Sequence, residues 1–237
     1  ILKFVKKNYP KVVTIFGGPN FNNYDLEKYF LERPYLDFYI VNQGETGFLE
    51  LINKYSEGKL DRNHQDTQQM ENLAFYNTKL NRVFIGNIAK RYKDLDIIPS
   101  PILDGTLDKF FEDKNLIPII ETMRGCPFTC TYCAWGDDWL RASNRFSLER
   151  VLSEIDYIAK KFSASKKKFN GYLYLADSNF GMHRRDSEIA TKIREVHDKY
   201  NWPRSIWATW AKNSNEKVIE IASILKPMLL AGVTIAY

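Results

Sequence analysis

The first 57 residues alternate between helical and buried-strand patterns of hydrophobic positions. Apolar side chains at helical spacing are followed by short apolar runs, and the cycle then repeats. This order, helix, strand, helix, strand and helix, covers residues 2–9, 11–18, 25–33, 36–41 and 45–58. Helices that alternate with buried strands predict a parallel sheet with crossover helices.

Residues 59–116 do not continue this alternation of helices and strands. They begin with a polar stretch and continue with two short strand-like runs, at 73–77 and 82–87. The prolines within residues 97–105 exclude regular structure there. We therefore expect a linker that contains a small hairpin.

The alternation resumes at Ile117 and continues to the last residue. Ser147 is placed to cap the first of the new helices by accepting from the backbone of Arg150. Repeated strand, loop and helix predict a barrel or a wound sheet, and in both folds the ligand site lies at the carboxyl ends of the strands. The expected strands are 117–121, 171–177, 205–213 and 229–237, and the expected helices are 147–162, 186–200 and 215–226.

Composition limits the class of protein. Hydrophobic residues make up 44 % of the chain and aromatic residues 14 %, which is far more than a disordered segment carries. The net charge of +5 comes from 34 basic and 29 acidic side chains spread along the chain, so a nucleic-acid partner is not expected. Neither a membrane-spanning run nor a signal peptide is visible, which favours the cytoplasm and no membrane partner.

The ends of the chain carry a further expectation. The chain opens at Ile1 inside an apparent helix and stops at Tyr237 inside an apparent strand. We expect it to be an internal part of a longer protein.

All three cysteines lie within eight residues, directly after an expected strand: Cys126, Cys130 and Cys133. Thiolates are soft ligands that suit iron–sulfur clusters, zinc or copper. Three thiolates on one loop can hold three corners of a cubic cluster and leave the fourth iron open. Structural zinc sites want a fourth ligand, and the three histidines, His64, His183 and His197, are all distant in sequence. An odd number of closely spaced cysteines also argues against disulfides.

The run MRGCPFTCTYCAWG, with three and then two residues between cysteines and an aromatic residue before the last one, resembles the signature of the radical S-adenosylmethionine superfamily. The strand and helix rhythm that follows resembles the superfamily's partial (β/α) barrel through four of its usual six strands. The resemblance implies a 4Fe-4S cluster on the three cysteines, with S-adenosylmethionine on the open iron. It also implies reductive cleavage to a 5′-deoxyadenosyl radical that abstracts hydrogen from a substrate.

Three residues near the cysteines have expected roles. Gly125 lets the backbone approach the cluster without a side-chain clash. Tyr132 resembles the family's aromatic beside the adenine, the alternative being an aromatic that only packs. Arg124 could offset negative charge near the cluster, or it could form a surface ion pair.

Polar residues follow two later strands. Asp177 and Asn179 stand where many superfamily members have a Gly-Gly-Glu type motif that receives the amino group of S-adenosylmethionine, and this chain departs from that motif. We expect both to bind the cofactor, and the alternative is a loop in which they bond their own backbone. Lys212 could meet the ligand carboxylate, or it could be an exposed lysine before a helix capped by Asn213 or Ser214.

The N-terminal part carries a second resemblance. VVTIFGGPNF, then LDFYIVNQGETGFLELI, then PSPILDG look like the join between a cobalamin-binding domain and a radical barrel. The resemblance implies that Gly17 and Gly18 let the backbone approach the nucleotide tail of cobalamin, and Gly44-Glu45 matches a second short signature of that family. The alternative is a tight turn at Gly17-Gly18 that binds nothing.

These expectations give one overall interpretation. Residues 1–58 are the later part of a flavodoxin-like domain of the cobalamin-binding type, 59–116 are a linker, and 117–237 are a truncated radical S-adenosylmethionine barrel. The resemblance implies a small-molecule or peptide substrate and an electron donor such as flavodoxin or ferredoxin. Methyl transfer with cobalamin is one outcome. The alternatives are rearrangement, oxidation or ring formation without cobalamin, and a non-catalytic metal protein that binds nucleic acid.

Overall fold

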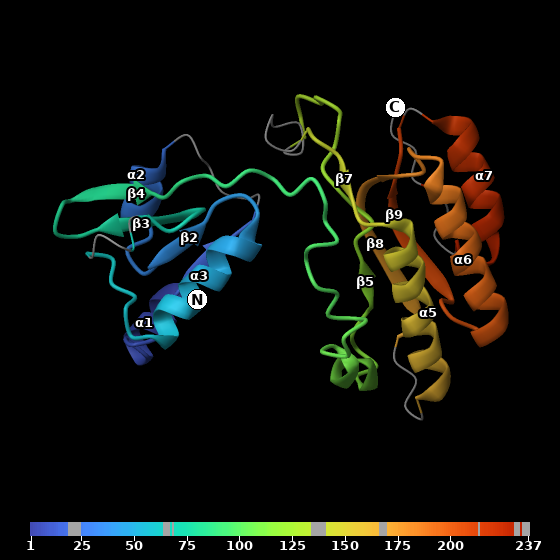
Figure 1. Ribbon diagram of the computed structural model, residues 1–237, viewed down its shortest axis with the longest axis horizontal. Coiled ribbons are helices and arrows are strands. Elements are labelled where there is room, and N and C mark those ends of the chain that lie inside the picture. The colour runs from blue at the N-terminus through green and yellow to red at the C-terminus, as the bar shows by residue number, and fades with distance from the viewer. Residues whose placement is uncertain are drawn as a thin grey trace. The chain divides into compact units, whose positions relative to one another are not determined.

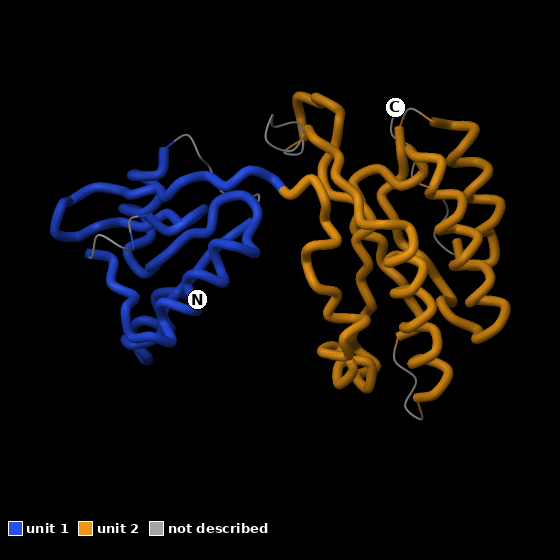
Figure 2. Tube along the Cα trace, in the orientation of Figure 1, with its two compact units in different colours: residues 1–91 blue, residues 92–237 orange. Residues whose placement is uncertain are grey.

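The computed structural model describes residues 1–18, 25–63, 67, 69–133, 141–165, 170–212, 214–229 and 233. These residues form the helices and strands of an α/β protein (Figure 1). The chain divides into two compact units, Ile1–Arg91 and Tyr92–Tyr237, and each has its own sheet and its own apolar core (Figure 2).

The N-terminal unit is built on a four-stranded sheet in the order β1, β2, β3, β4. The pair β1 and β2 is parallel, whereas β3 runs antiparallel to both β2 and β4. The hairpin expected within residues 59–116 is therefore present, and it extends this sheet. The elements are α1 (Leu2–Asn8), β1 (Ile15–Gly17), α2 (Leu26–Leu31), β2 (Phe38–Ile40), α3 (Gly44–Ser56), β3 (Leu73–Asn77) and β4 (Arg82–Ile85).

A buried carboxylate joins the beginnings of the two parallel strands. The backbone N–H of Thr14 donates to Asp37 Oδ2 over 2.8 Å, and the Thr14 hydroxyl donates to the same oxygen over 3.0 Å. Lys6 and Arg62 form ion pairs with Asp37. This arrangement keeps the buried charge paired, as burial requires.

The C-terminal unit contains a three-stranded parallel sheet in the order β5, β8, β9, with α5 and α6 between successive strands along the chain. Ser147 caps α5 as expected, because its hydroxyl accepts from the Arg150 N–H over 3.2 Å. The elements are η1 (Asp108–Glu112), β5 (Ile119–Ile120), β6 (Met123–Arg124), β7 (Asn144–Arg145), α5 (Leu148–Ala164), β8 (Tyr172–Phe180), α6 (Arg185–Tyr200), β9 (Ser205–Trp210), α7 (Asn215–Leu225) and η4 (Lys226–Met228).

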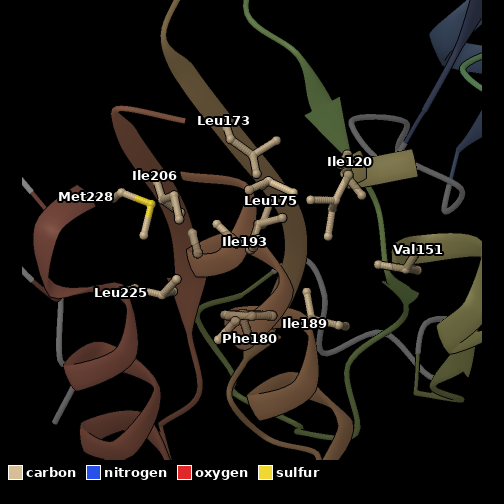
Figure 3. Close-up of a cluster of buried hydrophobic side chains, with 14 of the residues drawn as sticks. Ile120, Val151, Leu173, Leu175, Phe180, Ile189, Ile193, Ile206, Leu225 and Met228 are labelled. Carbon is tan, nitrogen blue, oxygen red and sulfur yellow. The ribbon is translucent and has the colours of Figure 1, made fainter. Parts of the chain in front are cut away.

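The two faces of this sheet differ. Leu173 and Leu175 of β8 are fully buried in the core with residues of α5, α6 and α7 (Figure 3). The alternate positions face the other way, and Trp207 of β9 is 72 % exposed there. One face therefore builds the core, and the other is open to carry a site.

Several details differ from the sequence-based expectation. Strand β8 continues past Asp177 to Phe180, and the short antiparallel pair β6 and β7 was not expected. Of the last expected strand, 229–237, only Leu229 and Val233 belong to the described residues, and Met228 closes η4. The expected domain boundaries at 58 and 116 stay a prediction. Among the described residues, no helix combines the length and the apolar character needed to cross a lipid bilayer.

Candidate functional site

The carboxylate of Asp177 anchors the segment that follows β5. Because Ile120 lies opposite Leu175 in the parallel register, two further residues along both strands bring Thr122 beside Asp177. Asp177 Oδ1 accepts from the backbone N–H of Thr122 at 2.7 Å and of Met123 at 3.2 Å, and the Thr122 hydroxyl donates to Oδ2. Asp177 is 3 % exposed. Burial raises the pKa of its carboxyl to about 6, although these hydrogen bonds lower it in part.

The next two residues of β8 hold the cysteine loop itself. The Ser178 hydroxyl donates to the carbonyl of Gly125 over 2.7 Å. Asn179 Nδ2 donates to Cys126 Sγ over 3.1 Å and to Ser178 Oγ over 3.2 Å. Gly125 has a φ of +104°, in the left-handed region that glycine adopts without strain. Asp177, Ser178 and Asn179 together therefore fix the start of the loop.

The three cysteines line one cavity of about 190 Å³. Cys126 is buried, whereas Cys130 and Cys133 are partly exposed. The N–H of Cys133 donates to the carbonyl of Cys130 over 3.0 Å, which gives this end of the loop a turn. The expected metal ligands thus meet the expected cofactor residues Asp177 and Asn179 at one cavity. Its other lining residues are Phe128, Tyr174, Ala176, Ser178, Thr209 and Lys212.

A site for a single metal ion has a different geometry from a cluster site. A single ion needs all its ligands within bonding distance of one point, whereas in a cubic cluster each thiolate binds a different iron. Within the part of the chain that the structure describes, no three His, Cys, Asp or Glu side chains are grouped as ligands of a metal ion.

Tyr132 and Lys212 lie next to each other beside the cysteines. Tyr132 is 76 % exposed. The Lys212 ammonium lies 3.4 Å from the Tyr132 hydroxyl and 5.5 Å from the centre of its ring. Lys212 lines the cavity. This position favours a role at the site over the alternative of an exposed lysine before a helix. Ser214 precedes α7 without a side-chain capping bond, and Asn213 lies outside the described residues.

The paired glycines of the N-terminal unit stand at the carboxyl end of β1. Gly18 has a φ of +99°, and its carbonyl accepts a hydrogen bond from the buried Tyr39 hydroxyl. A Cβ on Gly17 would lie 3.5 Å from the Ile40 carbonyl oxygen, which is an ordinary contact, and a Cβ on Gly18 would meet nothing within 4 Å. The backbone conformation at position 18 therefore favours glycine, and among the described residues it is Gly18, not Gly17, that has open space beside it.

Known proteins were compared with this chain. A scan against models of protein families finds no match. The chain is 30 % identical over 243 residues to the cobalamin-dependent radical SAM methyltransferase TokK of Streptomyces tokunonensis, an alignment that covers 100 % of this chain and 33 % of TokK. The chain belongs to the radical S-adenosylmethionine superfamily. Within that superfamily, its relatives belong to the cobalamin-dependent branch.

A second relative of this chain is 2-(S-pantetheinyl)-carbapenam-3-carboxylate methyltransferase of Streptantibioticus cattleyicolor. It is 29 % identical over 244 residues, which cover 100 % of this chain and 33 % of the relative. The chain thus spans about a third of the length of both relatives. A solved structure of TsrM from Kitasatospora setae, with cobalamin and a 4Fe-4S cluster bound, matches 98 % of this chain and 42 % of TsrM. The TM-score is 0.59 and the identity 15 %, so this likeness concerns the fold alone.

The donor set at the cavity fits the cluster of a radical S-adenosylmethionine protein. Three thiols are soft donors, and a cluster that they bind as thiolates gathers negative charge. The N–H of Asn179 and the ammonium of Lys212 complement that charge from the same cavity wall. Arg124 contributes less directly, because its guanidinium forms an ion pair with Glu121 at 2.7 Å.

Two residues of this radical S-adenosylmethionine site were not found from the sequence. Thr122 and Ser178 were missed because their partners lie 55 and 53 residues away along the chain. A signal for Thr122 did exist, since it directly follows the expected strand 117–121 just as Asp177 ends the neighbouring one. The same signal existed for Ser178, which directly follows the expected strand 171–177.

Proposed function

We propose that the intact protein is a cobalamin-dependent radical S-adenosylmethionine enzyme that transfers a methyl group to a small-molecule substrate. The observation that carries this proposal is the meeting of Cys126, Cys130 and Cys133 at one cavity beside the end of β8. The names of TokK and the carbapenam methyltransferase support methyl transfer, and the name of TokK supports cobalamin dependence.

The proposal includes the finer architecture of the two units. The parallel order β5, β8 and β9, with a helix between successive strands, supports a partial (β/α) barrel in residues 117–237. The parallel pair β1 and β2 supports a flavodoxin-like origin for residues 1–58.

The chain's own residues have defined tasks at this site. Cys126, Cys130 and Cys133 would hold a 4Fe-4S cluster through their thiolates, three ligands for its four irons. When bound, the reduced 4Fe-4S cluster supplies the electron that cleaves the sulfonium of S-adenosylmethionine. Lys212, which lines the cavity, would meet the carboxylate of S-adenosylmethionine, and the neighbouring Tyr132 would lie beside its adenine.

Asp177 and Asn179 line the cavity and form hydrogen bonds with the cysteine loop and the residues before it. Both carboxylate oxygens of Asp177 already accept hydrogen bonds from Thr122 or Met123, so Asp177 positions the loop. The amide of Asn179 donates to Cys126 of the loop, and Asn179 lines the cavity in which the cofactor would bind.

Cobalamin belongs to the N-terminal unit in this proposal. The missing side chains of Gly17 and Gly18, and the open space that the described residues leave beside Gly18, suit the approach of a nucleotide tail to the end of β1. A flavodoxin or ferredoxin delivers the electrons. The cytoplasm is the expected location, because a reducing compartment keeps the three cysteines available as thiols.

The test uses the intact protein, purified and reconstituted without oxygen. It should contain iron and sulfide of a 4Fe-4S cluster, bind hydroxocobalamin stoichiometrically and form 5′-deoxyadenosine from S-adenosylmethionine when reduced. Gly17→Val should abolish cobalamin uptake and leave the iron content unchanged. A colourless, zinc-loaded protein would refute the cluster. A protein that cleaves S-adenosylmethionine yet ignores cobalamin would replace methyl transfer by radical chemistry without cobalamin.

A further inference from the structure

The side-chain amide of Asn179 directs its nitrogen at the sulfur of Cys126, at a distance of 3.1 Å. The bond is shielded from solvent, because Asn179 is 2 % exposed and Cys126 is 8 % exposed. A hydrogen bond in such surroundings is electrostatically stronger than one in water. Cys126 thus differs from Cys130 and Cys133, which are partly exposed.

Ser178 determines which end of the amide faces the sulfur. Its hydroxyl gives its proton to the Gly125 carbonyl over 2.7 Å, so its oxygen lone pairs remain free to accept. Asn179 Nδ2 donates to that oxygen over 3.2 Å. If the amide were reversed, two acceptor oxygens would face each other. The serine therefore holds the NH₂ group toward Cys126.

Resting on the proposed function, we propose that Asn179 is a positioning residue that raises the reduction potential of the 4Fe-4S cluster through the sulfur of Cys126. A thiolate bound to iron has no proton to donate, so it can only accept from the amide. Its negative charge increases when the cluster gains an electron, and an N–H donor stabilises that state more than the oxidised one. Hydrogen bonds to the sulfurs are among the factors that set such potentials.

The position of Asn179 gives the effect a structural cause. The side chains of the three consecutive residues Asp177, Ser178 and Asn179 all bond to the start of the cysteine loop. The strand end thus combines two tasks: Asp177 and Ser178 hold the loop, and Asn179 acts on a metal ligand.

The experiment is a redox titration of the cluster, followed by electron paramagnetic resonance, in the intact protein purified without oxygen. Iron and sulfide are measured on every sample. Asn179→Leu removes the donor at similar volume, and Asn179→Asp places a carboxylate against the sulfur. Ser178→Ala frees the amide to turn. The matched control is Asn144→Leu, since Asn144 lies in the same unit and donates to the Tyr92 carbonyl instead of a cysteine.

The midpoint potential should shift to more negative values in Asn179→Leu and further in Asn179→Asp. Ser178→Ala should give a smaller shift in the same direction, and Asn144→Leu none. If Asn179→Leu loses its cluster, Asn179→Asp and Ser178→Ala decide the question. Unchanged potentials in cluster-loaded variants would overturn the role of Asn179 alone. A wild-type protein without iron and sulfide would overturn the proposed function itself.

Discussion

Two loops of this protein follow parallel strands and use a glycine in the left-handed region, yet they differ in what surrounds that glycine. After β1, Gly18 has a φ of +99° and its carbonyl is bonded by Tyr39. After β5 and the short β6, Gly125 has a φ of +104°, and three consecutive side chains of β8 bond to the loop around it. The backbone requirement is the same in both loops.

The difference lies in the donors that each loop presents. The loop at Gly125 leads into three soft thiols around one cavity, so its residue types specify the chemistry. At Gly17-Gly18 the described residues present backbone and, beside Gly18, open space, which suit a cofactor tail and a simple turn equally well. A glycine pattern therefore predicts conformation, and the side chains around it predict function.

The largest effect is expected at the cysteine loop. Cys130→Ala leaves two thiolates for a cubic cluster, so the intact protein should lose its iron and sulfide, and cleavage of S-adenosylmethionine should fall to background. The control is Gly18→Ala, which changes the other loop and should leave the iron content intact. Full iron and sulfide in Cys130→Ala would place the cluster elsewhere.

Asp177, which anchors the same loop, should contribute to the free energy of unfolding. Asp177→Ala leaves the N–H groups of Thr122 and Met123 without their acceptor, so the free energy of unfolding should fall by about 3 kcal/mol. Urea unfolding followed by tryptophan fluorescence measures it, because all five tryptophans of this chain lie within residues 135–210. Asp198→Ala removes an exposed carboxylate paired with Arg194 and should cost about 0.5 kcal/mol or less. Equal losses in both variants would contradict the anchor.

Asp177 should also impart a pH dependence. Its pKa is raised from 3.8 to about 6 in the folded state, so between these values the folded protein keeps a proton that the unfolded chain has released. Stability from this group is thus fully present below pH 3.8 and is lost as the pH rises through about 6, by on the order of 2–3 kcal/mol.

The matched variant for this titration is Asp177→Asn, which imitates the neutral carboxyl. Burial also raises the pKa of Asp186, so the informative quantity is the difference between the wild type and Asp177→Asn across the pH range. The wild type should lose stability relative to the variant from pH 4 to pH 6. Parallel curves would show that Asp177 stays ionised throughout.

The smallest effect is expected at the glycine turn. Gly18→Ala places a side chain at a φ of +99° and should lower the free energy of unfolding by about 1–2 kcal/mol. Gly17→Ala adds a methyl group at ordinary contact distance from Ile40 and should change it by about 0.5 kcal/mol or less. Thermal unfolding followed by circular dichroism compares the two. An equal cost at Gly17 would mean that the space beside β1 is needed for packing.

Much of this fold is predictable from local pattern. The helices of both units, the hairpin at 73–85 and the cap at Ser147 follow from spacing and capping rules, and the structure confirms them. The pairing of β3 with β2 does not follow from such rules, because strand order depends on packing between distant segments. Periodicity identifies a strand without identifying its neighbour.

The candidate site divides in the same way. The grouping of the cysteines with Asp177 and Asn179 was predicted, because strand ends of a parallel sheet meet at one edge. The extension of β8 past Asp177, through Ser178 and Asn179 to Phe180, was not predicted, since residues such as Asn are depleted in strands. Hydrogen bonds from these residues to the cysteine loop outweigh that propensity, and because they join residues more than fifty positions apart, local propensity does not predict them.

The bonds between the end of β8 and the cysteine loop have a consequence for how the protein is made. Every group in them belongs to the polypeptide, so the receptor for the sulfur sites takes shape as the chain folds. If the proposed cluster binds here, its iron would therefore enter a site that is already folded, and folding would not have to wait for the metal.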